Sequence, residues 1–189
     1  MENQLFHKAA HMVNSVMRQV KTEDLGKPTP CSKWDVNALC NHILSETAWI
    51  EPLLAGKTIA EVGTALDGDL VQGKPLEAWQ RYMQSAVNAA SSTPPETTAH
   101  LSYTDKPVTD YLNEVGGDLI VHGWDLARAV GVEYIIDDET ARLIQKGAEP
   151  TMPMAREAGL FASEVVPKPD CSQAEKLLAA FGRDINWGI

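Results

Sequence analysis

Four long stretches of the sequence repeat apolar side chains every three to four residues, a spacing that is typical of amphipathic helices. These stretches are residues 3–24, 32–55, 75–91 and 108–130. Few strand signals accompany them, so we expect an all-α protein built as a four-helix bundle. The segment Ser32–Asp35 resembles a capping box, which predicts that the second helix begins at Ser32. Gly116 and Gly117, inside the fourth stretch, indicate that another helix approaches closely there.

The remaining segments are shorter and are often interrupted by glycine and proline. We expect a loop with one short helix over 57–73 and an extended or irregular stretch over 96–107. Additional short C-terminal helices are predicted near 137–148 and 172–181, with a stretch broken by proline and glycine between them. The length of 189 residues fits one domain, so residues 1–189 are treated as a single domain.

Charge and cysteine content narrow the class of protein. The chain has 26 acidic and 16 basic residues, a formal net charge of -10. Such an acidic surface repels nucleic-acid phosphates and anionic lipids, so we expect neither nucleic acid nor membrane as a partner. Three cysteines without a C-x-x-C motif predict neither a disulfide framework nor a cysteine-rich metal site. With no signal peptide or long apolar segment, we expect a cytoplasmic monomer or homodimer.

Polar residues on the apolar side of two predicted helices are the strongest functional signal. His122 falls in the middle of the apolar stripe of 108–130, and Asp118 lies one turn earlier on the same side. His42 and Glu46, again four residues apart, line one flank of the stripe of 32–55. Because residues four apart on a helix lie above one another, each pair can contribute to one ion site.

This combination of imidazole and carboxylate suits a divalent metal, zinc above all and nickel as a second choice. His42, Asp118 and His122 would leave one coordination position open for water or substrate, whereas a fourth ligand from Glu46 would close the site. A simpler interpretation remains open, in which His122 is a core histidine whose hydrogen-bond partner is Asp118 and no metal is bound.

Three segments resemble a known family. They are Thr29–Val36 followed by Asn41 and His42, then Asp118–Ala129, and finally the tail Leu177–Asp184 that continues to Trp187. The first two resemble motifs of the mycothiol-dependent maleylpyruvate isomerase N-terminal domain family, part of the DinB-like superfamily of metal-binding four-helix bundles. The tail is similar to that of an actinobacterial-type subgroup without a settled function. The resemblance implies a DinB-like fold with a metal triad formed by His42, Asp118 and His122, although many relatives have Glu or His where this chain has Asp118.

The resemblance also implies a class of reaction. Members with an activity use a low-molecular-weight thiol such as mycothiol or bacillithiol, so it implies S-transfer from such a thiol to a small electrophile. Glu46 and Trp49 would then shape the thiol pocket. Two alternatives stay open: a metal-dependent hydrolase with Glu46 or Asp125 as general base, and a metal-binding stress or binding protein without catalysis. Because the C-terminal region is short, isomerisation of maleylpyruvate itself is not implied.

Overall fold

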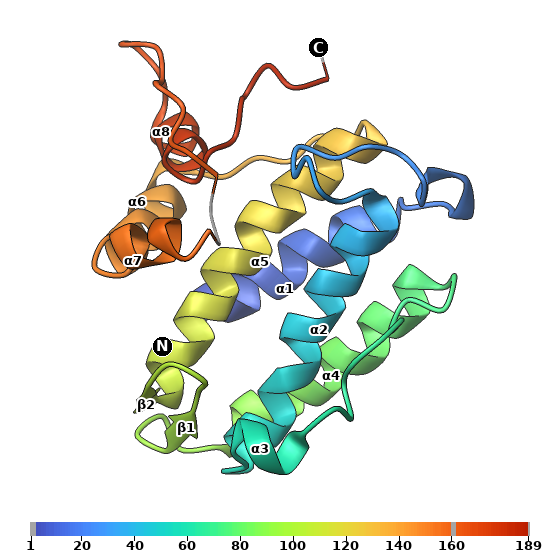
Figure 1. Ribbon diagram of the computed structural model, residues 1–189, viewed down its shortest axis with the longest axis vertical. Helices are drawn as coiled ribbons and strands as arrows, with labels where there is room; N and C mark the ends of the chain where they lie inside the picture. The colour runs from blue at the N-terminus through green and yellow to red at the C-terminus, as the bar shows by residue number, and fades with distance from the viewer. Residues whose placement is uncertain (1–2, 160–161, 189) are drawn as a thin grey trace.

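Four long helices form the main body of the computed structural model, which describes residues 3–159 and 162–188. They are α1 (Gln4–Met17), α2 (Val36–Leu54), α4 (Pro75–Ser92) and α5 (Val108–Val130). Helix α1 packs against α4 and α5, and α2 packs against the same two helices, so that each long helix has two neighbours (Figure 1). The predicted all-α class is therefore confirmed.

Short elements join and flank these helices. They are a 3-10 turn, η1 (Thr22–Asp24), the helices α3 (Ile59–Val62), α6 (Asp138–Ala148), α7 (Met152–Glu157) and α8 (Gln173–Ala180), and the strands β1 (Thr98–His100) and β2 (Asp105–Pro107). The two strands pair antiparallel and contact the first part of α5. Helix α6 packs against both α5 and α8, which places the C-terminal helices beside α5 (Figure 1). No helix in the described ranges is long and apolar enough to cross a membrane.

The start of α2 differs from the prediction. The helix begins at Val36, and its cap is Asp35, whose carboxylate accepts a hydrogen bond of 2.8 Å from the backbone of Ala38. The predicted cap at Ser32 is wrong because the preceding residues form a turn, in which the backbone N–H of Trp34 donates to Cys31 at 2.8 Å. As a result, Trp34 and Cys31 belong to the loop before α2.

Two other helix boundaries also differ. The first helix ends at Met17 rather than near residue 24, and the rest of that stretch contains only the short turn η1. The stretch expected to be broken by proline and glycine contains α7, with Pro153 in its first turn. Proline is tolerated there because the first turn has no intrahelical partner for its missing N–H.

Helix α5 is the most buried element of the fold. Every residue from Leu119 to Ala127 is buried. A Cβ atom on Gly116 would lie 2.9 Å from the backbone nitrogen of Phe6 in α1, which agrees with the predicted close approach of another helix. The buried stretch of α5 also contains His122 and Asp125, and polar side chains in such surroundings require partners.

Candidate metal centre

The structure brings together the three residues that the sequence singles out as metal ligands. His42 lies in the second turn of α2, and Asp118 and His122 lie on successive turns of α5. One ligand atom from each lies within 4.8 Å of the other two. Nε2 of His42 is 3.5 Å from Oδ2 of Asp118, and Nε2 of His122 is 3.5 Å from Oδ1 of the same carboxylate. Two nitrogens and one carboxylate thus face a common point between the two helices.

These atoms are poorly satisfied by one another. A separation of 3.5 Å is longer than an ordinary N–H···O hydrogen bond. Within the described residues, Nε2 of His42 and Oδ2 of Asp118 are buried and have no hydrogen-bond partner. An unpaired buried polar group costs about 1–3 kcal/mol. A divalent cation would satisfy these atoms together, so the donor set fits a metal such as zinc.

The carboxylate of the triad is held in its charged form. Burial acts to raise the pKa of Asp118, but the positive charge that His122 can carry and the contact with His42 outweigh it. The result is a pKa of about 2. Asp118 is therefore ionised at neutral pH, and a cation that replaced the protons of the histidines would likewise favour its charged form.

The second ring nitrogen of His122 has a different partner. Nδ1 of His122 lies 3.0 Å from Oδ2 of Asp125, which is completely buried. Burial acts to raise the pKa of Asp125, but the hydrogen bond with His122 and the charge of Arg183 hold it below its ordinary value. An ionised carboxylate can only accept, so Nδ1 is the donor and the lone pair of the neutral ring lies on Nε2, toward Asp118.

Asp125 also binds Arg183, a residue that the sequence analysis did not single out. Its Nη2 donates to Oδ2 of Asp125 at 2.7 Å, and its Nε donates to Oδ1 at 3.2 Å. Cys31 also approaches, with Sγ 3.2 Å from Oδ2 of Asp125. Arg183 follows α8 and is distant in sequence from the other residues, so neither spacing nor helix periodicity could have identified it.

Cys31, His122 and Asp125 form a second group of potential ligands, but a cation already lies beside it. The guanidinium of Arg183 is 3.4 Å from Sγ of Cys31 and 2.7 Å from Asp125. Burial and the charge of Asp125 raise the pKa of the Cys31 thiol to about 12, so it remains protonated at neutral pH. Because metals bind thiolates rather than thiols, we interpret this group as a hydrogen-bond network.

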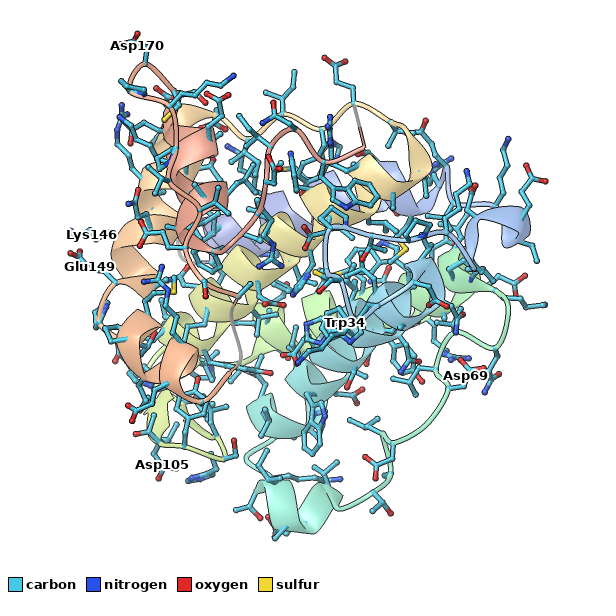
Figure 2. All side chains as sticks on the ribbon, turned by 45° about the horizontal axis from the view of Figure 1, so that its top comes forward. Trp34, Asp69, Asp105, Lys146, Glu149 and Asp170 are labelled. Carbon is cyan, nitrogen blue, oxygen red and sulfur yellow. The ribbon has the colours of Figure 1, made fainter. Side chains whose placement is uncertain are left out.

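Trp34 forms an aromatic wall of the site. Its ring centre lies 4.7 Å from that of His42 and 5.6 Å from that of His122. The two imidazoles meet edge to face, with centres 4.6 Å apart. In Figure 2, Trp34 lies between the ribbons of α2 and α5. Trp49, the wall residue favoured by the sequence, is half-buried against the hydrophobic core. Trp34 contacts the two histidine rings from the loop before α2.

Glu46 lies one turn after His42 on α2 and is half-buried. Burial and the negative charge of Asp118 raise its pKa to about 7, although His42 acts in the opposite direction. Its carboxyl oxygens are not within the group of mutually close ligand atoms that contains Asp118. Glu46 can therefore gain or lose a proton near neutral pH, beside the triad.

Comparisons with known proteins agree with the resemblance seen in the sequence. A family model described as the mycothiol maleylpyruvate isomerase N-terminal domain matches residues 6–127, which include His42, Asp118 and His122 but not Arg183. Two uncharacterised proteins of Mycobacterium tuberculosis, from strains CDC 1551 / Oshkosh and ATCC 25618 / H37Rv, are each 26% identical over 173 residues. That alignment covers 90% of this chain and 91% of each relative. No solved structure matches the chain significantly.

Proposed function

Because the chain belongs to the mycothiol maleylpyruvate isomerase N-terminal domain family, we propose that it is a metal-dependent thiol S-transferase. His42, Asp118 and His122 would hold one divalent cation, with zinc preferred to nickel. The observation that carries the proposal is the convergence of three ligands, in which Nε2 of His42 and Oδ2 of Asp118 are buried 3.5 Å apart and form no hydrogen bond with any described residue. Three protein ligands leave a position for a thiol.

The reaction joins the thiol sulfur to an electrophilic carbon while the bond from that carbon to its leaving group breaks. When bound, zinc would lower the pKa of a thiol from its free value of about 8.5, so that thiolate is present at neutral pH. Glu46 supports the proposal because its half-buried carboxylate, one turn from His42, can accept the proton that the thiol releases. Trp34 covers both imidazole rings and limits the access of water from its side.

A mycothiol-type thiol and a small electrophile are the proposed substrates. The family description names mycothiol, and this is the basis for choosing it over other thiols. We place the reaction in the cytoplasm, where low-molecular-weight thiols are kept reduced. Trp34 also offers an apolar surface beside the open position, against which the carbon skeleton of the electrophile can pack.

The test compares zinc-loaded and metal-free protein in thioether formation. Mycothiol is mixed with a halogenated aromatic electrophile, and the product is followed by its absorbance. We expect faster reaction with the zinc-loaded protein, slower reaction with glutathione, and loss of the acceleration in His42→Ala. His100→Ala is the matched control, because His100 also pairs with a carboxylate, Asp105 at 3.0 Å, but lies in β1. Equal rates for loaded and metal-free protein with every thiol would contradict the proposal.

A metal-dependent hydrolase is the second candidate, and the raised pKa of Glu46 favours it. A carboxylate whose pKa is raised in the metal-free protein, and which lies one turn from a proposed metal ligand, is suited to take a proton from an attacking water. Asp125 is less suited, because His122, Arg183 and Cys31 already occupy its oxygens. Ester and amide substrates distinguish this candidate: zinc-dependent hydrolysis that Glu46→Gln abolishes, without thioether formation, would replace the transferase. Metal binding without either reaction would leave the non-catalytic alternative.

A further inference from the structure

The C-terminal segment returns to α5 at two points. After α8 the chain turns back toward the end of α5 (Figure 1). Arg183 reaches the carboxylate of Asp125 through Nε and Nη2. Arg128 of α5 donates in the other direction, to the backbone carbonyl oxygens of Ile185 at 3.3 Å and Trp187 at 2.6 Å. The first contact connects the segment to the metal centre, whereas the second touches only its backbone.

The local backbone fixes the guanidinium of Arg183. Its backbone N–H donates to Leu178 at 2.8 Å, and its Nη1 donates to the carbonyl oxygen of Phe181 at 2.7 Å. Gly182 makes the turn with a φ of 81°, and a Cβ there would lie 2.7 Å from Cβ of Ala162. The side chain of Arg183 is therefore directed by the end of α8 as well as by Asp125.

The carboxylate of Asp125 connects this arginine to the histidine. Oδ2 lies 2.7 Å from Nη2 of Arg183 and 3.0 Å from Nδ1 of His122. With Asp125 at 0% and Arg183 at 8% exposure, water competes little for either contact. A carboxylate fixed in this way can accept the proton on Nδ1 only, so the neutral ring presents its lone pair at Nε2. A ligating histidine whose other nitrogen donates to a carboxylate is oriented and made more basic.

We propose that Asp125 and Arg183 are positioning residues for the metal centre, which fix the tautomer and the orientation of His122 from the side opposite the metal. This inference rests on the metal site of the proposed function and adds that the C-terminal segment completes it. Arg183 lies outside the part of the chain that the family model matches, residues 6–127. The site would therefore require residues from both the matched segment and the tail.

The test measures the tautomer of His122 directly and the zinc affinity separately. Long-range proton–nitrogen NMR spectra of the full chain, isotope-labelled at histidine, are recorded without metal at about pH 8, where an ordinary histidine is neutral. We expect the proton on Nδ1 in the wild type. In Asp125→Asn the introduced amide can donate to Nδ1, so the proton moves to Nε2. In Arg183→Gln the carboxylate of Asp125 loses its hydrogen bonds from the guanidinium, and we expect a mixture of His122 tautomers.

Zinc affinity is then measured by competition with a coloured chelator. We expect it to fall about 10–100-fold in Asp125→Asn and Arg183→Gln, the usual effect of removing a partner of a metal-bound histidine. Arg128→Gln is the matched control, because it cuts the other contact between the tail and α5 without touching Asp125. It should keep the wild-type tautomer and an affinity within about twofold of the wild type. Arg183→Lys keeps the positive charge but cannot donate through two nitrogens as the guanidinium does, so it should retain only part of the wild-type zinc affinity.

Several results would overturn the inference. One is a wild-type His122 that carries its proton on Nε2. Another is an unchanged tautomer and zinc affinity in both Asp125→Asn and Arg183→Gln, with native helical circular dichroism. If Arg183→Gln does not fold, Arg183→Lys and Asp125→Asn carry the same comparison. A wild type that binds no zinc would contradict the metal site on which both proposals rest, whereas a proton on Nε2 in a wild type that binds zinc would contradict only the role of Asp125 and Arg183.

Discussion

At the scale of single residues, His122 offers its two ring nitrogens to two different carboxylates. Asp125 takes the N–H of the ring at 3.0 Å, and Asp118 lies 3.5 Å from the other nitrogen. The second distance is longer than an ordinary hydrogen bond, which supports the proposal that a cation lies between His122 and Asp118. The simpler interpretation of the sequence expected Asp118 as the hydrogen-bond partner of His122, whereas the structure gives that role to Asp125.

The first residue-scale prediction concerns metal content. His42→Ala and His122→Ala should each abolish stoichiometric zinc binding, because two remaining ligands hold zinc far less tightly than three. Elemental analysis after dialysis gives the number of metal ions per chain, and circular dichroism checks that the helices remain. His100→Ala should bind zinc like the wild type. Undiminished metal content in both triad variants would show that the metal binds elsewhere.

The second residue-scale prediction follows from the pKa of Glu46, which is raised to about 7. A carboxyl group with a raised pKa in the folded state stabilises the fold fully below its unfolded pKa of about 4.3. That contribution is lost as the pH rises through the folded pKa. In metal-free protein, Glu46→Gln should therefore raise the free energy of unfolding at pH 8 by about 1 kcal/mol, a modest value because the side chain is only half-buried. Urea unfolding at pH 5 and pH 8 measures the difference, which should be smaller at pH 5.

The triad could be predicted from the sequence because helical spacing alone places Asp118 and His122 on one side of α5. His42 could be assigned to the same site because it lines one flank of the apolar stripe of another predicted helix, and the family resemblance implies the same three residues. Trp34 and Arg183 could not be placed, because both lie in irregular segments whose path depends on tertiary contacts. Because Asp35 caps α2, Trp34 lies in the loop before that helix. No local sequence pattern indicates the path of the chain after the turn at Gly182.

At the scale of elements, the contact of α1 with α5 depends on a missing side chain. A Cβ on Gly116 would lie 2.9 Å from a backbone atom of α1, and backbone cannot move aside cheaply. Gly116→Ala should therefore lower the free energy of unfolding by about 1–3 kcal/mol, as overpacking usually does. Gly147→Ala is the matched control, because this glycine is exposed in α6 and a Cβ there would meet no described atom within 4 Å. Because alanine favours helix, that variant should gain about 0.5–1 kcal/mol. Equal stability of the two variants in chemical unfolding would contradict the close approach.

At the scale of the whole molecule, the site joins three parts of the chain that are far apart in sequence. The loop before α2 and α2 itself supply Cys31, Trp34 and His42, α5 supplies Asp118, His122 and Asp125, and the tail supplies Arg183. The order of the long helices could be predicted from hydrophobic periodicity. The return of the tail to α5 could not, because it depends on tertiary contacts such as the ion pair of Arg183 with Asp125 and the hydrogen bonds of Arg128 to the tail backbone.

Metal binding at such a site should stabilise the entire fold. A ligand that binds only the folded protein adds about 2.7 kcal/mol at a hundredfold excess over its Kd. For a chain of this size, 1 kcal/mol corresponds to about 2–4 °C in Tm, so we expect zinc to raise Tm by about 5–10 °C and a chelator to reverse the change. The effect should fade below about pH 6, because a histidine must lose its proton to bind metal, and protonation then competes with zinc. Calorimetry of the wild type and of His122→Ala at pH 7.5 and pH 5.5 tests both points, and the variant should not respond to zinc at either pH. If neither zinc nor the chelator changed the wild-type Tm, the result would instead favour the interpretation in which the triad residues contact one another and no metal is bound.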